Sequence, residues 1–550
     1  MSQIRLLVLF VFILTSFSQA LALKDGEALR ALPVQSDGRL KPFDSFAREM
    51  LELVYGKQKY EGRDAYEIIL TWMLAPQAWA SKELFEVRNH EVLKNLGMDL
   101  TKRYFKGDEL FSNAKFNDLR ADLNIKRESK EKLNPYFQAL QRLENQFFIF
   151  SEIASGRMIK MVPPKEGKDW LPVSQLDGEL QAQFLELSKA FISVISYGVS
   201  NNTEGTDSLE VKKIKLDTQV AKFKEIAKQN NPTLYPDPFR IDAEIHYNLF
   251  HPFRWAYIFY IIGALLVLFS WITSNERAMT LAWLVLGCGF FLHIYGFGLR
   301  SYLMGRAPVT NMYETVVWVS WGSLLFAGIL EKIYKFKFTL LAGSIVAGFG
   351  MIIADSTPVV LDPALQPLEP VLRSNYWLTI HVMTITISYS AFFLAFALGD
   401  IGLIYFLKGE KKNHDKIKAI VMATYKAIQI GVVFLAPGII LGGIWADYSW
   451  GRFWGWDPKE TWALIALLGY ILVLHARLVG WIKDFGMVVS GVITFSLVIM
   501  AWYGVNFVLG AGLHSYGFGA GGVEYVAGFV MAHILLVIYV TVLRKNRLES

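Results

Sequence analysis

Tryptophans and charged side chains are concentrated in one short segment, residues 450–462, which reads W-G-R-F-W-G-W-D-P-K-E-T-W between two long apolar stretches. A buried core would not hold so many charges, and a solvated loop would not hold so many aromatic rings. The mixture favours a surface at a membrane–water boundary that binds a large, flat, apolar molecule with charged edges. Haem, a planar macrocycle with two carboxylates, fits this description. The candidate binding residues are Trp450, Arg452, Trp454, Trp456, Asp457, Lys459 and Trp462.

These side chains offer two kinds of contact to such a molecule. Trp454 and Trp456 provide flat apolar area with an N–H group at the edge. Arg452 and Lys459 can pair with carboxylates, the arginine in a bidentate manner. Asp457 precedes a proline at a predicted helix start, which indicates an N-cap. That structural role does not exclude a part in positioning the aromatic rings.

A second polar segment, residues 305–314, reads G-R-A-P-V-T-N-M-Y-E and also joins two apolar stretches. It predicts a turn followed by a capped helix. Glu314 near the start of that helix suits the helix dipole. A carboxylate buried at this place would need a partner.

Nine histidines are further candidates for chemistry. Four lie in polar or juxtamembrane segments and are predicted to be solvated or interfacial; these are His90, His246, His251 and His414. The other five lie within or between apolar spans, where an ionisable group is expensive and becomes a candidate functional residue. These five are His293, His381, His475, His514 and His533.

The positions of three histidines predict two separate sites. We expect His381 and His514 at the same end of the membrane helices as segment 450–462, where two imidazoles could ligate one haem iron from both sides. The alternative is a hydrogen-bonding role unrelated to iron. His475 follows Trp462 by thirteen residues on one predicted helix, which places it roughly 20 Å deeper at about 1.5 Å per residue. His475 therefore belongs to a second site or hydrogen-bonds to a neighbouring helix.

The elements that must position these residues are membrane helices. Hydrophobic residues make up 53% of the 550, which predicts an all-α polytopic membrane protein with a soluble portion. Residues 1–23 indicate a signal peptide or signal anchor, 24–250 an extracytoplasmic, mainly helical domain, and 251–550 the membrane domain. About nine spans are expected, at 255–272, 279–299, 312–331, 338–355, 376–407, 426–446, 462–480, 486–507 and 524–543.

The distribution of lysine and arginine predicts the orientation of these spans. With the soluble domain outside, the inner segments hold about fourteen such residues and the outer loops of the membrane region about five. We therefore expect a cytoplasmic C-terminus and segment 450–462 on the outer side.

Composition excludes several classes of protein. The single cysteine, Cys288, cannot form an internal disulfide or a C-x-x-C motif, so the chain is neither a c-type cytochrome nor a dithiol oxidoreductase. Any haem would be held without covalent attachment. The net charge of +6 does not gather into an aromatic-laced basic stripe, so no nucleic-acid partner is expected.

The motifs together resemble a known family. Segment 450–462 resembles the WWD domain of the haem-handling proteins of cytochrome c maturation, and its ending D-P-K-E-T-W resembles the CcsA/ResC branch of the system II cytochrome c synthase. The resemblance extends over nearly the whole chain, through G-R-A-P-x-x-N-M-Y-E at 305–314, W-L-x-x-H-V at 377–382, H-A-R at 475–477, G-x-G-L-H-S-Y-G at 510–517 and L-P-V-Q-x-x-G-R-L-K-P at 32–42, the last as in fused CcsB–CcsA proteins.

The resemblance implies a holocytochrome c synthase (haem lyase) subunit of the bacterial inner membrane. Haem b would enter from the cytoplasmic side, bind non-covalently in transit at His475, and be presented on the periplasmic side between His381 and His514. There its vinyl groups would meet the thiols of a C-x-x-C-H apocytochrome c, kept reduced by thioredoxin-like proteins. In the fused family the second ligand of the internal haem comes from the CcsB portion, so a CcsB/ResB-like membrane partner is expected; His293 is a weak alternative.

Two other functions are compatible with the same residues. One is a haem transporter or chaperone without ligation activity. The other is a haem-binding subunit of a respiratory electron-transfer complex, which would favour paired histidines within facing spans. Here the best pair, His381 and His514, lies in or near the outer loops.

Overall fold

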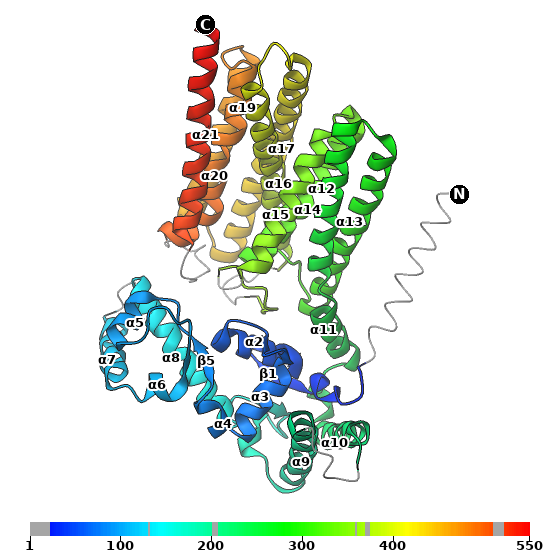
Figure 1. Ribbon diagram of the computed structural model, residues 1–550, viewed down its shortest axis with the longest axis vertical. Helices are drawn as coiled ribbons and strands as arrows, with labels where there is room; N and C mark the ends of the chain where they lie inside the picture. Colours follow the sequence, from blue (N-terminus) through cyan, green and yellow to red (C-terminus); the bar gives the residue numbers. More distant parts are fainter. Residues whose placement is uncertain are drawn as a thin grey trace. The chain divides into compact units, whose positions relative to one another are not determined.

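The computed structural model describes two compact units, Met1–Phe250 and His251–Ser550, and each is treated by itself (Figure 1). Nearly all of the predicted signal segment, 1–23, lies outside the described residues. The described ranges are 23–129, 133–200, 207–357, 360–368, 375–509 and 522–549.

The first unit is mainly helical. Its larger helices surround an apolar core that includes Phe43, Trp72 and Phe105, all nearly inaccessible to solvent. Its helices are η1 (Ala28–Ala31), α2 (Phe43–Tyr55), α3 (Ala65–Leu74), α4 (Gln77–Ala80), α5 (His90–Leu96), α6 (Gly107–Phe111), α7 (Ala114–Glu128), α8 (Pro135–Ala154), η2 (Val173–Gln175), α9 (Gly178–Ser200), α10 (Leu209–Asn230), η3 (Pro232–Leu234) and α11 (Pro238–Phe250).

Four small antiparallel sheets accompany these helices. The sequence patterns did not predict these sheets. In the first sheet Ser36 lies opposite Arg39, so Asp37 and Gly38 form a two-residue turn. Both turn residues have positive φ, 50° and 74°, as a type I′ hairpin requires. The sheets pair β1 (Pro33–Ser36) with β2 (Arg39–Pro42), β3 (Lys59–Tyr60) with β4 (Arg63–Asp64), β5 (Glu83–Glu86) with β6 (Tyr104–Lys106), and β7 (Lys160–Val162) with β8 (Leu171–Pro172).

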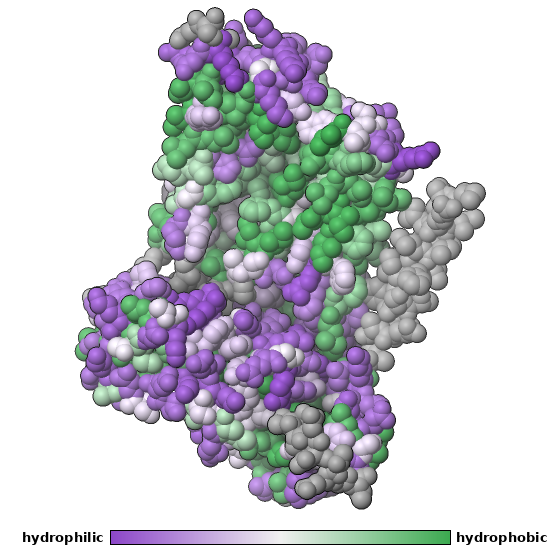
Figure 2. Space-filling model, in the orientation of Figure 1, coloured by the Kyte–Doolittle hydropathy of each residue, from purple (hydrophilic) through white to green (hydrophobic). Residues whose placement is uncertain are grey.

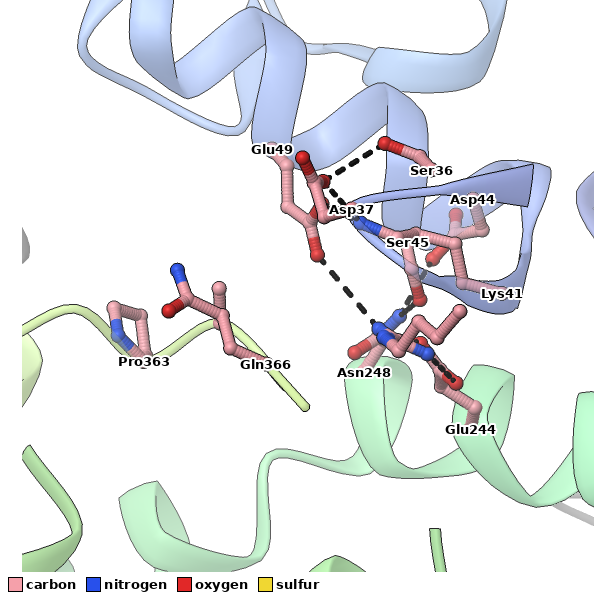
Figure 3. Close-up of polar contacts among 12 residues, drawn as sticks. Ser36, Asp37, Lys41, Asp44, Ser45, Glu49, Glu244, Asn248, Pro363 and Gln366 are labelled. Carbon is pink, nitrogen blue, oxygen red and sulfur yellow. Dashed lines mark hydrogen bonds and ion pairs between the residues drawn. The ribbon is translucent and has the colours of Figure 1, made fainter. Parts of the chain in front are cut away.

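A network of ion pairs ties the β1–β2 hairpin to α2 and α11. The Lys41 ammonium contacts Asp37 at 2.9 Å and Glu49 at 2.5 Å (Figure 3). Arg39 donates to both carboxylate oxygens of Glu244 at 2.8 Å. His246, expected at an interface, is instead buried, because α11 packs on α2 and β2.

The second unit is a bundle of long helices. Nine helices among its described residues and the end of the first unit are long and apolar enough to cross a membrane, which confirms the predicted polytopic fold. Figure 2 shows hydrophobic side chains covering the visible helices between polar ends. The helices are α12 (Pro252–Thr273), α13 (Glu276–Met304), α14 (Met312–Tyr334), α15 (Phe338–Ser356), α16 (Asn375–Leu407), α17 (His414–Trp450), α18 (Pro458–Leu478), α19 (Asp484–Ile493), α20 (Phe495–Ile499), the π-helical η5 (Met500–Leu509) and α21 (Val523–Glu549).

Small residues let these helices approach closely. A Cβ on Gly343 of α15 would lie 2.1 Å from Ala327 of α14, and one on Gly431 of α17 would lie 2.3 Å from the ring of Phe392 on α16. Close backbone approach of this kind is the usual basis of helix packing in membranes. The helix α17 begins twelve residues before the predicted start at 426, because its polar first turns continue the helix beyond the apolar stretch.

Candidate functional site

The Trp-rich segment, 450–462, is a short connection between two helix ends. The helix α17 ends at Trp450, and its C-cap, Gly451, has a left-handed φ of 71°. Asp457 is the N-cap of α18, and its side chain accepts from the backbone N–H of Lys459 at 2.9 Å. The Glu460 carboxylate accepts from the backbone N–H groups of Gly455 (2.8 Å) and Asp457 (3.1 Å). The predicted cap is confirmed, and it forms a capping box with Glu460.

Charged and aromatic side chains also pack against one another within this segment. The Arg452 guanidinium lies 5.7 Å from the ring centre of Trp450 and 3.4 Å from the Glu460 carboxylate. The rings of Trp454 and Trp456 meet edge to face at 5.7 Å. Trp456 has a φ of 56° and is 69% exposed. A strained, exposed tryptophan is costly unless its exposure serves binding.

A cavity of about 160 Å³, open on one side, lies beside the segment. Its walls come from residues 309–315, α16, α17, α18 and η5. Of the predicted site residues, the structure brings together His381, Trp454 and Lys459 in this lining. The other tryptophans of the segment, Arg452 and Asp457 lie outside the described lining.

The imidazole of His381 is held in a defined orientation. Its Nδ1 lies 2.9 Å from the carbonyl oxygen of Gly438, which can only accept, so Nδ1 carries a proton. In the neutral ring the lone pair is then on Nε2, the form that binds a metal. The ring lies parallel to Trp445 within 8° at 6.2 Å. Gly442 leaves room for it, since a Cβ there would lie 2.5 Å from the imidazole.

Hydrogen-bond donors from α18 and η5 line the same cavity. The Lys459 ammonium lies 3.4 Å from Asn506 Oδ1, and the Asn506 amide donates to the carbonyl of Trp502 at 3.0 Å. The indole N–H of Trp502 is buried with no hydrogen-bond partner among the described residues. An ammonium and an unpaired buried N–H suit a ligand that carries carboxylates.

Asn506 and Trp502 were not among the predicted site residues. A polar asparagine within the apolar stretch 486–507 was the available signal. Both lie on η5, and π-helical segments are frequent at functional sites.

A buried charge cluster supports the wall formed by residues 309–315. Glu314 is inaccessible to solvent and pairs with Arg300 at 2.9 Å and Arg306 at 2.8 Å. The two guanidinium groups also donate to the carbonyls of Pro363 and Gln366. The predicted capped helix is confirmed, with Asn311 as its N-cap. The cluster ties the cavity wall to the segment that follows α15.

The remaining predicted histidines lie away from this cavity or outside the description. His475 is exposed near the far end of α18, and its Nδ1 donates to the carbonyl of Ile471 in the same helix at 2.8 Å. His293 is fully buried and contacts the Tyr260 hydroxyl at 2.9 Å. His514 lies outside the described residues. In the part of the chain that the structure describes, His475 therefore lies away from the cavity that His381 lines.

A multi-pass membrane protein with an aromatic and histidine-lined cavity suggests a protein that handles a flat prosthetic group, and the comparisons with known proteins agree. The family model "Cytochrome C assembly protein" matches residues 309–514. Protein NrfI of Wolinella succinogenes is 29% identical over 510 residues, 87% of this chain and 53% of its own length. The cytochrome c biogenesis protein CcsA of Chlamydomonas reinhardtii is 34% identical over 45% of this chain and 72% of its own. CcsA of Guillardia theta is 34% identical over 40% of this chain and 80% of its own length.

The chain belongs to the CcsA-type cytochrome c biogenesis family. It spans about half the length of NrfI. The chain therefore has a role in cytochrome c biogenesis, and its family implies the handling of haem.

Proposed function

We propose that this protein carries haem b across the membrane and presents it, beside segment 450–462, for covalent attachment to apocytochrome c. Haem is the substrate and is held without covalent bonds. The single observation that carries the proposal is the His381 imidazole, fixed through Nδ1 and placed in the lining of the cavity beside segment 450–462. His514 is its proposed partner on the iron.

The residues of the cavity fit the edges and faces of haem. Lys459 and the unpaired indole N–H of Trp502 offer donors for propionates. Trp454, together with the exposed ring of Trp456, offers apolar faces. Arg452 is engaged with Glu460, so it would serve a propionate only by sharing or exchanging that partner.

Attachment joins two cysteine thiols of a C-x-x-C-H segment to the two haem vinyl groups. At each vinyl group a bond forms between sulfur and one carbon, while the thiol hydrogen goes to the other carbon, so no oxidant is consumed. The chain's contribution is proximity and orientation of the haem. Thioredoxin-like proteins supply reduced thiols to this step.

The route to the cavity involves a second site and a partner protein. His475, near the far end of α18 from the cavity, is the proposed ligand of haem on its way across. A CcsB/ResB-like membrane protein would supply the second ligand there. In this arrangement the protein lies in the bacterial inner membrane, with segment 450–462 and the domain 24–250 on the periplasmic side and the C-terminus in the cytoplasm.

The test is covalent haem attachment in a host that lacks its own maturation system. The chain is expressed with a CcsB-like partner, a C-x-x-C-H reporter and its reductant, and covalent haem is read from denaturing gels. His381→Ala should abolish the signal, whereas His414→Ala, at an exposed position at the start of α17, should not. Wild-type protein that carries haem but leaves the reporter unmodified would contradict ligation and leave a transporter or chaperone.

A further inference from the structure

Three arginine side chains of the first unit converge on one buried carboxylate. The side chain of Glu86, the last residue of β5, is inaccessible to solvent. Its Oε1 atom accepts from Arg103 Nε at 2.7 Å and lies 3.0 Å from a guanidinium nitrogen of Arg88. Its Oε2 atom lies 3.6 Å from a guanidinium nitrogen of Arg142. These three arginines and Glu86 are called the arginine cluster below.

The arginine cluster is held by β5, β6 and α8. Arg103 directly precedes β6, and its backbone carbonyl accepts from the N–H of Val87 at 3.0 Å. Arg142 lies one turn before Gln146 on α8. The buried amide of Gln146 donates to the backbone carbonyl of Glu86 at 3.2 Å. Because these backbone segments are fixed to one another, the guanidinium groups are placed before any ligand arrives, which lowers the entropic cost of binding.

The arginine cluster carries more positive than negative charge. Among the described residues, Glu86 is the only carboxylate that pairs with any of the three guanidinium groups. Burial and repulsion by Arg88 and Arg103 hold the pKa of Arg142 below its ordinary value, in spite of the attraction of Glu86. Three cations that share one anion would be stabilised by a further anion.

The arginines of the cluster are open to an incoming ligand. The side chains of Arg88, Arg103 and Arg142 are 49%, 54% and 34% exposed. A guanidinium group has five N–H donors in a planar fork, and Glu86 engages only some of them. Such a fork matches the two oxygens of a carboxylate.

Two aromatic rings and a fourth cation border the arginine cluster. The ring of Tyr104 lies 4.8 Å from that of Tyr55, and the Arg103 guanidinium lies 5.8 Å from the centre of the Tyr104 ring. The Lys57 ammonium lies 5.8 Å from the centres of both rings, and its side chain is exposed. The positive surface therefore extends from the three arginines across two rings, further than a single small anion reaches.

We propose that the arginine cluster is the docking site for an acidic peptide segment of a protein partner, whose carboxylates pair with the exposed guanidinium groups. Recognition of acidic motifs by groups of arginines is a recurrent mode of peptide binding. The open surface and the fourth cation favour a segment with several carboxylates, since small ligands are bound in enclosed, mostly apolar sites. The docking site belongs to the first unit and does not depend on the proposed haem site.

The test is the binding of a fluorescent peptide, in which glutamate alternates with glycine, to the full-length protein in a non-ionic detergent. Fluorescence anisotropy should show binding that weakens as salt is added. The same peptide with glutamine in place of glutamate should not bind. Arg88→Gln and Arg103→Gln should each weaken binding of the glutamate peptide by about 2- to 10-fold.

The matched control is Arg157→Gln, which makes the same change of net charge elsewhere in the first unit. Arg157 is exposed and pairs with a carboxylate of its own, Glu152, so this variant should bind the peptide like wild type. An equal loss of binding in Arg157→Gln would show general attraction to a positively charged protein and would overturn the inference. Failure of folded wild-type protein to bind the glutamate peptide would overturn it as well.

Glu86→Gln separates a shaped site from general attraction. It makes the protein more positive but removes the carboxylate that orients the three guanidinium groups, so binding of the peptide should weaken. Stronger binding in this variant would overturn the inference. Displacement of the peptide by inorganic phosphate at the same concentration of anionic groups would overturn it in favour of a small-anion site. Displacement by soluble short-chain phosphatidylglycerol, without displacement by phosphate, would overturn it in favour of a lipid surface.

Discussion

The imidazole of His381 is confined on three sides by residues of a single helix, α17. The carbonyl of Gly438 accepts a hydrogen bond from its Nδ1–H, Trp445 lies parallel to it, and Gly442 leaves the space that the ring occupies. Such confinement fixes both the tautomer and the direction of the ligating nitrogen before any iron arrives. Preorganised ligands of this kind bind without the entropic loss of ordering a free side chain.

Gly442→Ala should therefore displace His381 with little direct effect elsewhere. The new methyl group would lie 2.5 Å from the imidazole, and overpacking of this kind costs about 1–3 kcal/mol. Haem content of the purified protein, read as absorbance per chain, should fall several-fold. Gly287→Ala, where the new methyl group meets open space, is the control; an equal loss there would show that the effect is not local.

A second residue-scale prediction concerns Glu49 in the first unit. Burial raises the pKa of this carboxyl from its ordinary 4.5 to about 7, in spite of the opposing attraction of Lys41 and Arg39. Between these two values the folded protein keeps a proton that the unfolded chain has released. Stability therefore decreases as pH rises through this window, by about 1.4 kcal/mol per unit of pKa difference.

Glu49→Gln should remove that contribution. Thermal unfolding of the full chain is compared at about pH 5 and about pH 8. The effect of pH on the unfolding of the first unit should be smaller than in wild type. The exposed Glu109→Gln is the control and should keep the wild-type pH effect. A variant of Glu49 that matches wild type at both pH values would contradict the raised pKa.

At the scale of elements, the start of α18 carries the geometry of segment 450–462. Asp457 and Glu460 together satisfy three backbone N–H groups of the segment and the first turn. Asp457→Ala should destabilise the helix start by about 1 kcal/mol and loosen the tryptophans that precede it. Haem content should fall, whereas Asp457→Asn, an equally good cap, should retain it. Equal losses in both variants would assign the charge of Asp457, rather than its cap, to binding.

The cluster around Glu314 makes a prediction about folding rather than binding. Glu314→Gln would leave Arg300 and Arg306 buried without their counter-charge, which typically destabilises by about 3–5 kcal/mol. The exposed pair Arg254–Asp355 offers the comparison: Asp355→Asn should cost less than about 1 kcal/mol. Thermal unfolding in one detergent measures both. Equal losses of stability in the two variants would contradict the conclusion that the Glu314 ion pairs stabilise the cavity wall.

Local patterns in the sequence predicted the helices and their caps. Nine apolar stretches correspond to nine candidate spans among the described residues. The order Asp457, Pro458 and Glu460 predicts an N-cap, because a capping box depends only on residues within one helix turn. The turn at Asp37 and Gly38 carried the same kind of local signal, yet the hairpin was missed because the strands beside it are only four residues long.

Contacts between distant helices could not be predicted in this way. The need of Glu314 for a partner was evident from its position, but the choice of Arg300 and Arg306 depends on how α13 and α14 pack. The same holds for His533 and Asp400, which only the packing of α21 on α16 brings together. Asn506 lines the cavity from η5, which is π-helical, and a helical repeat of 3.6 does not reveal such a local change in winding.

At the scale of the whole molecule, the two proposed haem positions lie near opposite ends of one helix, α18. The cavity adjoins the first turn of α18, and His475 lies seventeen residues further along, close to its other end. A rise of about 1.5 Å per residue puts these levels roughly 25 Å apart, close to the thickness of a bilayer core. A single haem cannot bridge that distance, so transfer between the positions requires movement of the haem.

The central claim is that His381 ligates haem in the cavity beside segment 450–462, and the most direct measurement is the spectrum of the full-length protein purified from haem-replete cells. The account predicts a low-spin b-type spectrum in wild type, its loss in His381→Ala, and its return when imidazole is added to that variant. A His381→Ala protein that keeps the wild-type spectrum and haem content would contradict the account.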